Sequence, residues 1–201
     1  MAETTRRRAP GMSAEERRAM IVAAAIPLVA EYGAAVTTKQ VARAAGIGEA
    51  TIFRVFADKD ELLGACVAEA VAPEHAVREI ASIPIDQPLE QRLADAAEAL
   101  SAHLERMGAV LGSLHASGHL RGPRGDQDGP RNDDRAESMR QIREAVAELF
   151  EPERQSLRLP PPKLAAVFLG VLFARPRMGA ESLEPAELVE LFLRGAVVEG
   201  E

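Results

Sequence analysis

The chain has 201 residues, of which 47% are hydrophobic and only 3% aromatic, and its formal net charge at pH 7 is −7. An apolar fraction made mostly of Ala, Leu and Val favours closely packed helices over sheets, so we predict an all-α fold. The single cysteine excludes an internal disulfide and suits a reducing cytoplasm, and we expect no membrane span and no cleaved leader.

The charge is divided unevenly along the chain. Residues 1–56 contain 8 Lys or Arg and 5 Asp or Glu, a net charge of +3, whereas residues 57–201 contain 16 and 26, a net charge of −10. A polyanion would be attracted to the first part and repelled by the second. The sequence therefore predicts that any nucleic acid is bound by the N-terminal part.

Residues 1–12 form a predicted flexible arm, because Pro10 and Gly11 interrupt any helix. Arg6, Arg7 and Arg8 are consecutive, and basic arms of this kind follow a phosphate backbone or enter a minor groove. A solvated tail without contacts is the alternative, and the sequence leaves both open.

Three helices are predicted next. Ser13 and Glu16 form a capping box that opens a helix ending at Gly33, and Thr37 with Gln40 forms a second box that opens a helix over residues 38–45. Gly46 supplies a left-handed residue for a turn, and a third helix follows over residues 49–55.

Two short helices joined by a glycine-containing turn of this length are typical of a helix-turn-helix, whose second helix enters the major groove of DNA. Ile52 and Phe56 are spaced to point inward. The opposite face then presents Glu49, Ala50, Thr51, Phe53 and Arg54.

The rest of the chain is also predicted to be helical. We expect a helix from Lys59 to Val71 that kinks or restarts at Pro73, and helices over residues 89–107, with a continuation toward 115, and 135–150. Residues 117–133 are rich in Gly, Pro and charge, which predicts a mobile loop.

The last two predicted helices cover residues 163–175 and the segment that starts at Pro185. The first is apolar on nearly all sides, which favours a subunit interface in which both helices pair with their two-fold mates as a four-helix bundle. Burial in the monomer's own core is the alternative. The predicted interface residues are Val167, Val171, Leu172, Leu188, Leu191 and Phe192.

The N-terminal pattern resembles the tetracycline-repressor (TetR) family of transcriptional regulators. The matching residues are Thr37, Thr38, Val41, Ala42, Ala45, Gly46, Ile47, Thr51, Phe53, Phe56, Lys59 and Leu62. With the first helix the resemblance covers about 50 residues, and the remainder matches only in its helical layout. It implies a homodimeric repressor that binds a palindromic double-stranded DNA operator and is released by a small ligand.

The resemblance also assigns roles to single residues. It implies that Thr37 caps its helix and contacts a phosphate, that Thr51 and Phe53 contact DNA, and that Lys59 contacts a phosphate. With Thr38, Ala50, Arg54 and the three arm arginines they complete the predicted DNA-binding set. The chain departs from the family where Phe53 replaces Tyr, where Val55 replaces His, and where Gly48 and Glu49 replace Ser or basic residues. Glu49 would repel phosphate and could accept from a cytosine amino group.

The predicted domains are the arm over 1–12, a helix-turn-helix domain over 13–58, and a ligand-binding and dimerisation domain over 59–201. The family implies a pocket in the last domain, suited to a small apolar or weakly polar effector. Candidate lining residues are Leu62, Cys66, Leu93, Leu100, Leu104, Met107, Met139, Ile142 and Phe168, each of which would also serve as plain core.

Other functions find little support in the sequence. His103, His115 and His119 are too few and lack a zinc pattern, so we expect solvated or hydrogen-bonded histidines, no metal and no cofactor. Cys66 is expected to be a buried thiol. The chain contains no nucleotide-binding or hydrolase motif, so we predict no enzyme. The alternative function is an all-helical interaction protein, or a constitutive DNA-binding protein without an effector.

Overall fold

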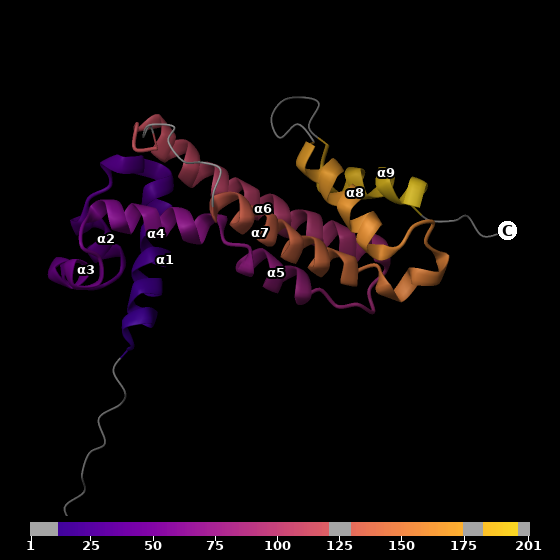
Figure 1. The fold of residues 1–201 in the computed structure, drawn as a ribbon, viewed down its shortest axis with the longest axis horizontal. Helices are drawn as coiled ribbons and strands as arrows, with labels where there is room; N and C mark the ends of the chain where they lie inside the picture. Colours follow the sequence, from indigo (N-terminus) through magenta and orange to yellow (C-terminus); the bar gives the residue numbers. More distant parts are fainter. Residues whose placement is uncertain (1–11, 121–129, 175–182, 197–201) are drawn as a thin grey trace, which may run out of the picture. The chain divides into compact units, whose positions relative to one another are not determined.

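A computed structural model describes residues 12–120, 130–174 and 183–196, and the elements within these ranges are all helices (Figure 1). The all-α class is therefore confirmed. The chain divides into two compact units, an N-terminal unit of Met1–Val71 with Met107–Gly122 and a C-terminal unit of Ala72–Arg106 with Pro123–Glu201. The predicted arm lies outside the described residues except for Met12.

The N-terminal unit contains α1 (Ala14–Tyr32), the 3-10 turn η1 (Gly33–Ala35), α2 (Thr38–Ala44), α3 (Glu49–Val55) and α4 (Lys59–Val71). It also contains the C-terminal part of α6 (Leu89–Ala116), a long helix whose first part belongs to the other unit. Apolar residues of all five helices share one core, which includes Ile21, Val41, Ile52, Leu63 and Val110. Helix α4 thus belongs to the same compact unit as the helix-turn-helix. The predicted boundary at residue 58, between a DNA-binding domain and a ligand-binding and dimerisation domain, stays a prediction.

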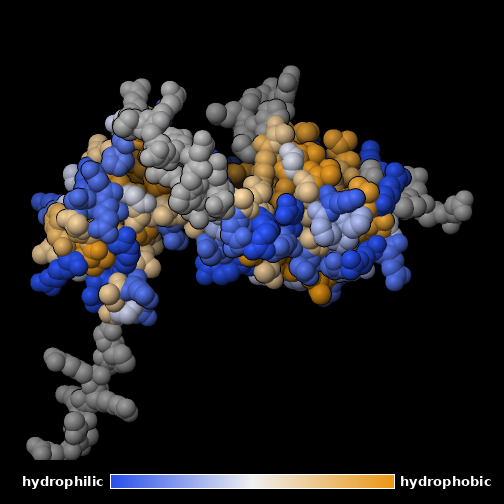
Figure 2. Space-filling model, in the orientation of Figure 1, coloured by the Kyte–Doolittle hydropathy of each residue, from blue (hydrophilic) through white to orange (hydrophobic). Residues whose placement is uncertain are grey.

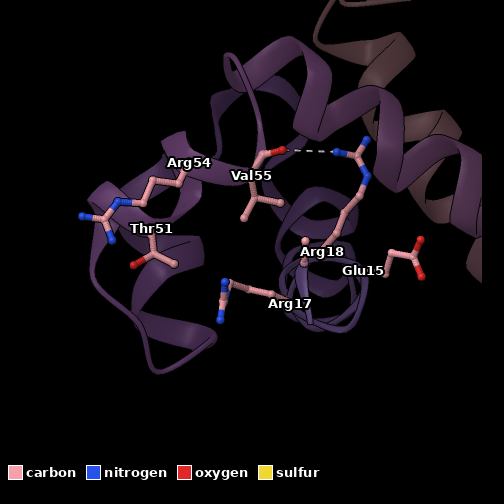
Figure 3. Close-up of a pocket in the computed structure, with 7 residues that line it drawn as sticks. Glu15, Arg17, Arg18, Thr51, Arg54 and Val55 are labelled. Carbon is pink, nitrogen blue, oxygen red and sulfur yellow. Dashed lines mark hydrogen bonds between the residues drawn. The ribbon is translucent and has the colours of Figure 1, made fainter. Parts of the chain in front are cut away.

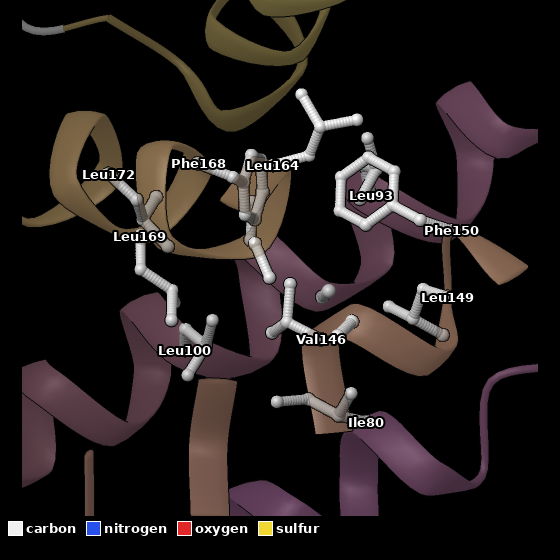
Figure 4. Close-up of a cluster of buried hydrophobic side chains, with 14 of the residues drawn as sticks. Ile80, Leu93, Leu100, Val146, Leu149, Phe150, Leu164, Phe168, Leu169 and Leu172 are labelled. Atoms are coloured by element: carbon white, nitrogen blue, oxygen red, sulfur yellow. The ribbon is translucent and has the colours of Figure 1, made fainter. Parts of the chain in front are cut away.

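The C-terminal unit contains α5 (Glu74–Ala81), the first part of α6, α7 (Pro130–Glu148), η2 (Glu151–Ser156), α8 (Pro161–Ala174) and α9 (Pro185–Ala196). Its core gathers side chains from each of the five α-helices (Figure 4). Phe168 meets the ring of Phe192 edge-on, with 5.4 Å between the ring centroids, and thereby joins α8 to α9.

Arg92 is a buried cation in this unit, with only 1% of its surface exposed. Its guanidinium donates to the carbonyls of Ile85 at 2.8 Å, Gln87 at 2.6 Å and Leu149 at 3.1 Å, and it forms an ion pair with Glu153. A buried charge is tolerated only when its hydrogen bonds are made. Arg92 therefore fastens the loop before α6 to the end of α7 and to η2.

Gly33 lies where α1 ends against the C-terminal part of α6. Its φ is +55°, and a Cβ atom there would lie 2.6 Å from the backbone oxygen of Ser113. The adjacent Ala34 amide donates to the Ser117 hydroxyl at 3.0 Å. Only glycine combines this backbone conformation with such a close approach.

Some element boundaries differ from the predictions. Pro73 acts as the N-cap of α5, so the helix restarts there rather than kinking. Helix α7 begins at Pro130, five residues before the predicted start, because proline is acceptable in a first helical turn. Residues 121–129 of the predicted mobile loop lie outside the described residues.

In the single chain helix α8 is buried on one face only, so burial in the monomer's own core, the alternative, accounts for that face and the subunit interface stays a prediction. One face, which includes Leu164, Phe168 and Leu172, is buried in the core, whereas Val167 and Val171 on the other face are exposed. An apolar sequence without polar positions does not indicate which face is covered.

The segment Ala14–Ala35 is long and apolar enough, by composition, to cross a membrane. In the structure its Ile21, Ala25 and Val29 are fully buried in the core of the N-terminal unit, as expected for a core helix. This segment is weak evidence for a span.

Candidate nucleic-acid interface

The start of α2 is fixed by the predicted capping box. The Gln40 amide donates to the Thr37 hydroxyl oxygen at 3.2 Å, and the Thr37 amide donates to the Gln40 side-chain oxygen at 2.8 Å. Each bond satisfies a backbone donor that would otherwise lack a partner. Thr37 remains exposed, which is compatible with the phosphate contact predicted for it.

The turn between α2 and α3 is a Schellman motif. Gly46 has φ +67°, its amide donates to the Arg43 carbonyl at 3.2 Å, and the Ile47 amide donates to the Ala42 carbonyl at 3.0 Å. Glycine is favoured at this position because a Cβ is disfavoured at positive φ. The turn redirects the chain so that α3 packs across α2, as in a helix-turn-helix.

Helix α3 has a buried face and an outward face. Ile52 is buried, as is Phe56 directly after the helix, while Ala50, Phe53 and Arg54 are exposed and Thr51 is half-buried. More than half of the Phe53 surface is accessible (53%), so its ring is available for contact with a partner on this face.

A hollow of about 530 Å³ separates the outward side of α3 from the start of α1 (Figure 3). Arg17 extends from α1 toward Thr51, whereas Glu15 points away on the other side of α1. The guanidinium of Arg17 donates a 3.1 Å hydrogen bond from its Nη2 atom to the Met12 carbonyl. The hollow is lined by Ala14, Glu15, Arg17, Arg18, Thr51, Arg54 and Val55.

Arg17 is not among the DNA-binding residues predicted from the sequence. The signal was available, because Arg17 and its neighbour Arg18 lie in the first turns of a capped helix and point to different sides. Arg18 is used by the fold: its guanidinium lies 4.4 Å from the centroid of the Phe56 ring and pairs with Glu61 at 2.9 Å. The pKa of Glu61 is lowered, first by the hydrogen bond from the Ala57 amide and then by Arg18.

Lys59 has a structural partner in the free protein. Its ammonium donates to the Ala34 carbonyl at 2.5 Å. An ammonium carries three donors, so the predicted phosphate contact would use another of them or replace this bond.

Glu49 is the first residue of α3, and one of its oxygens accepts from the Thr38 hydroxyl at 2.6 Å. This bond ties the first turn of α3 to the first turn of α2. The bond uses the hydroxyl proton of Thr38, and Thr38 is one of the residues predicted to contact DNA.

The predicted effector residues fall into both units. Leu62 and Cys66 are buried in the core of the N-terminal unit, and burial raises the pKa of the Cys66 thiol to about 11. Leu93, Leu100, Ile142 and Phe168 are buried in the core of the C-terminal unit. Leu104 and Met107 are half-buried, and Met139 is exposed.

His103 differs from the expectation of a solvated or hydrogen-bonded histidine. It is 6% exposed, and its Nδ1 atom has no hydrogen-bond partner within the described part of the chain. Burial, followed by the nearby charges of Arg106 and His75, lowers its pKa. Helical periodicity could not reveal this, because the burial of one position on a helix depends on what packs against it.

Two of the predicted interface residues are unavailable to a partner subunit in this conformation, because Leu172 and Leu188 are fully buried in the C-terminal unit. Phe192 is half-buried against Phe150 and Phe168. Val167, Val171 and Leu191 remain accessible at 49%, 40% and 64%. Figure 2 shows apolar side chains gathered over α8 and α9 on one face.

Comparison with known proteins agrees with this geometry. The family model described as "Bacterial regulatory proteins, tetR family" matches residues 21–66, from the middle of α1 to the middle of α4. This part of the chain is similar to the DNA-binding part of the TetR family. The helix-turn-helix formed by α2 and α3 lies within the matched residues.

Solved structures share the fold of the whole chain. A protein from Mesorhizobium loti described as a TetR-family regulator is 19% identical, with a TM-score of 0.59 over 92% of this chain and 98% of that one. A TetR regulator from Streptomyces coelicolor is 20% identical, with a TM-score of 0.56 over 91% and 99%. NalD of Pseudomonas aeruginosa, described as the secondary repressor of a multidrug efflux pump, is 22% identical, with a TM-score of 0.50 over 92% and 98%.

Proposed function

We propose that this chain is a TetR-family regulator, a cytoplasmic, non-enzymatic homodimeric repressor that binds a palindromic operator through α3 and leaves it when a small effector binds. The observation that carries the DNA-binding part is the outward face of α3. Thr51, Phe53 and Arg54 lie there opposite the buried Ile52, and Arg17 extends toward the same surface. Hydroxyl and guanidinium groups are the side chains that contact phosphates and base edges.

Dimerisation is supported by the exposed apolar residues Val167, Val171 and Leu191 on α8 and α9. Their other face is already occupied by the core of the unit. Pairing these helices with those of a second copy would remove this apolar surface from water and supply the two heads that a two-fold symmetric operator requires.

The effector is proposed to be small and apolar or weakly polar. Leu93, Leu100, Ile142 and Phe168 supply apolar surface in the C-terminal unit, and the unpaired Nδ1 of the buried His103 supplies a single polar atom. Effector pockets commonly combine an apolar lining with few polar groups.

DNA binding is tested by mobility shift on the chain's own upstream DNA at several salt concentrations. Removing Arg17, Thr51 or Arg54 by alanine substitution should weaken binding by roughly 5- to 100-fold, and the arginine variants should also reduce the salt dependence. Arg143→Ala, an exposed arginine on α7, is the matched control and should bind normally. Failure of the wild-type chain to bind any DNA in a salt-dependent manner would refute the proposal.

Effector release is tested separately, by a ligand screen that follows thermal unfolding. A ligand at a hundred times its dissociation constant should stabilise the protein by about 2.7 kcal/mol. The same ligand should then release the DNA complex. A chain that binds DNA but is neither stabilised nor released by any compound would instead support constitutive binding.

A further inference from the structure

Glu49 carries a negative charge at the start of the helix proposed to enter the major groove. It is exposed, and it is the first residue of α3, where the second helix of a helix-turn-helix contacts base edges. A carboxylate close to phosphates is repelled by them. A hydrogen-bond donor on a base, placed next to the carboxylate, would offset this repulsion.

Thr38 holds this carboxylate in place. Its hydroxyl donates to one oxygen of Glu49 at 2.6 Å, and the bond links α2 to α3. A carboxylate has two oxygens and about four lone-pair sites, so one bond leaves acceptor capacity for a base. Because the side chain is already oriented, less conformational entropy is lost when the base binds.

An acceptor-only group can distinguish bases. In the major groove the donors are the amino groups of cytosine and adenine, but adenine also presents its N7 acceptor beside the amino group. That acceptor would face the second carboxylate oxygen and repel it. Cytosine presents a donor without an acceptor of its own in this groove, and carboxylates are known to accept from it.

We propose that Glu49 selects a cytosine in each operator half-site by accepting a hydrogen bond from the cytosine amino group, and that Thr38 positions the carboxylate. The inference rests on the proposed function, because it requires α3 to enter the major groove. It adds a specificity-determining residue outside the predicted DNA-binding set.

The test is selection of bound sequences from a random double-stranded DNA library by the full-length chain. Wild-type protein should select cytosine at one position per half-site. Glu49→Ala should lose roughly tenfold discrimination at that position alone. Glu49→Gln should prefer adenine there, because an amide pairs with both N6 and N7 of adenine.

Two further variants separate base recognition from charge and from folding. Glu69→Ala removes the same charge from an exposed position on α4 and should leave the selected sequence unchanged. Thr38→Val should reduce discrimination at the cytosine position, and Thr38→Ser, which keeps the hydroxyl, should restore it.

The outcomes distinguish the two proposals. If wild-type protein selects no sequence at all, the proposed function fails. If wild-type protein and Glu49→Ala select the same sequence with the same preference at every position, DNA binding stands and the role of Glu49 is refuted. The role of Glu49 is also refuted if the base preference that depends on Glu49 is for a base other than cytosine.

Discussion

Cys66 lies among apolar side chains in the core of the N-terminal unit, and burial raises its pKa to about 11. The thiolate is the reactive form, so at pH 8 only about a thousandth of the folded protein would carry it. We predict that a disulfide reagent labels Cys66 slowly in the native protein and at once in denaturant. Rapid labelling of the native protein at pH 8 would contradict the burial of this thiol.

The same shift makes stability depend on pH. The folded pKa is raised, whereas an unfolded cysteine titrates near 8.5. The contribution to stability is therefore complete below about pH 8.5 and is lost as the pH rises toward 11. A Cys66→Ala variant should lack this part of the decline between these values.

The hydrogen bonds of the buried Arg92 lead to a prediction about stability. Arg92→Met keeps much of the apolar stem but leaves the carbonyls of Gln87, Ile85 and Leu149 without their donor. We expect a loss of about 3–5 kcal/mol in the free energy of unfolding, measured in denaturant.

Arg140→Met is the matched control, because Arg140 pairs with Glu137 and Glu144 on the exposed surface of α7. Such pairs contribute at most about 1 kcal/mol. Equal losses in the two variants would show that the buried position of Arg92 is not what matters.

Among the helices, the end of α1 packs closely against α6 because Gly33 lacks a side chain. We predict that Gly33→Ala destabilises the protein by at least 1–3 kcal/mol, since it combines positive φ with a collision at the Ser113 carbonyl. Gly64→Ala in the middle of α4 faces open space and should be neutral or stabilising by up to about 1 kcal/mol. Thermal unfolding of both variants tests this contrast.

The helix-turn-helix could be predicted from local chemistry. Thr37 and Gln40 define where α2 begins, Gly46 defines where it ends, and the predicted span of α3 agrees with the structure. These signals depend on residues three or four positions apart, so a single sequence contains them.

Features that depend on distant partners could not be predicted in this way. Nothing local shows that Arg92 reaches the carbonyl of Leu149, that His103 is covered, or that the Thr38 hydroxyl donates to Glu49. For the same reason, the sequence did not distinguish Leu172, which is buried, from its neighbour Val171, which is exposed. Both are apolar, and only the packed partner of α8 decides between them.

For the whole molecule, the central prediction concerns association. Val171→Glu or Leu191→Glu would place a charge in the proposed interface of α8 and α9 while leaving the core intact. We expect the dimer dissociation constant to rise by about two orders of magnitude, and operator affinity to fall with it. Sedimentation equilibrium measures the first effect and mobility shift the second.

Ile85→Glu is the matched control, because Ile85 is as exposed as Leu191 but lies outside α8 and α9. It should leave the oligomeric state unchanged. If all three variants behave alike, or if the wild-type chain is monomeric at micromolar concentration, the proposed interface is wrong.

The sharing of α6 between the units has a consequence for synthesis on the ribosome. The core of the N-terminal unit includes Val110 and Leu114, about 40 residues beyond the end of α4. Because a nascent chain emerges from its N-terminus, this unit cannot complete its core until α5 and nearly all of α6 have been made. A fragment ending at Val71 would expose the apolar surface that these two residues cover, and should be prone to aggregation.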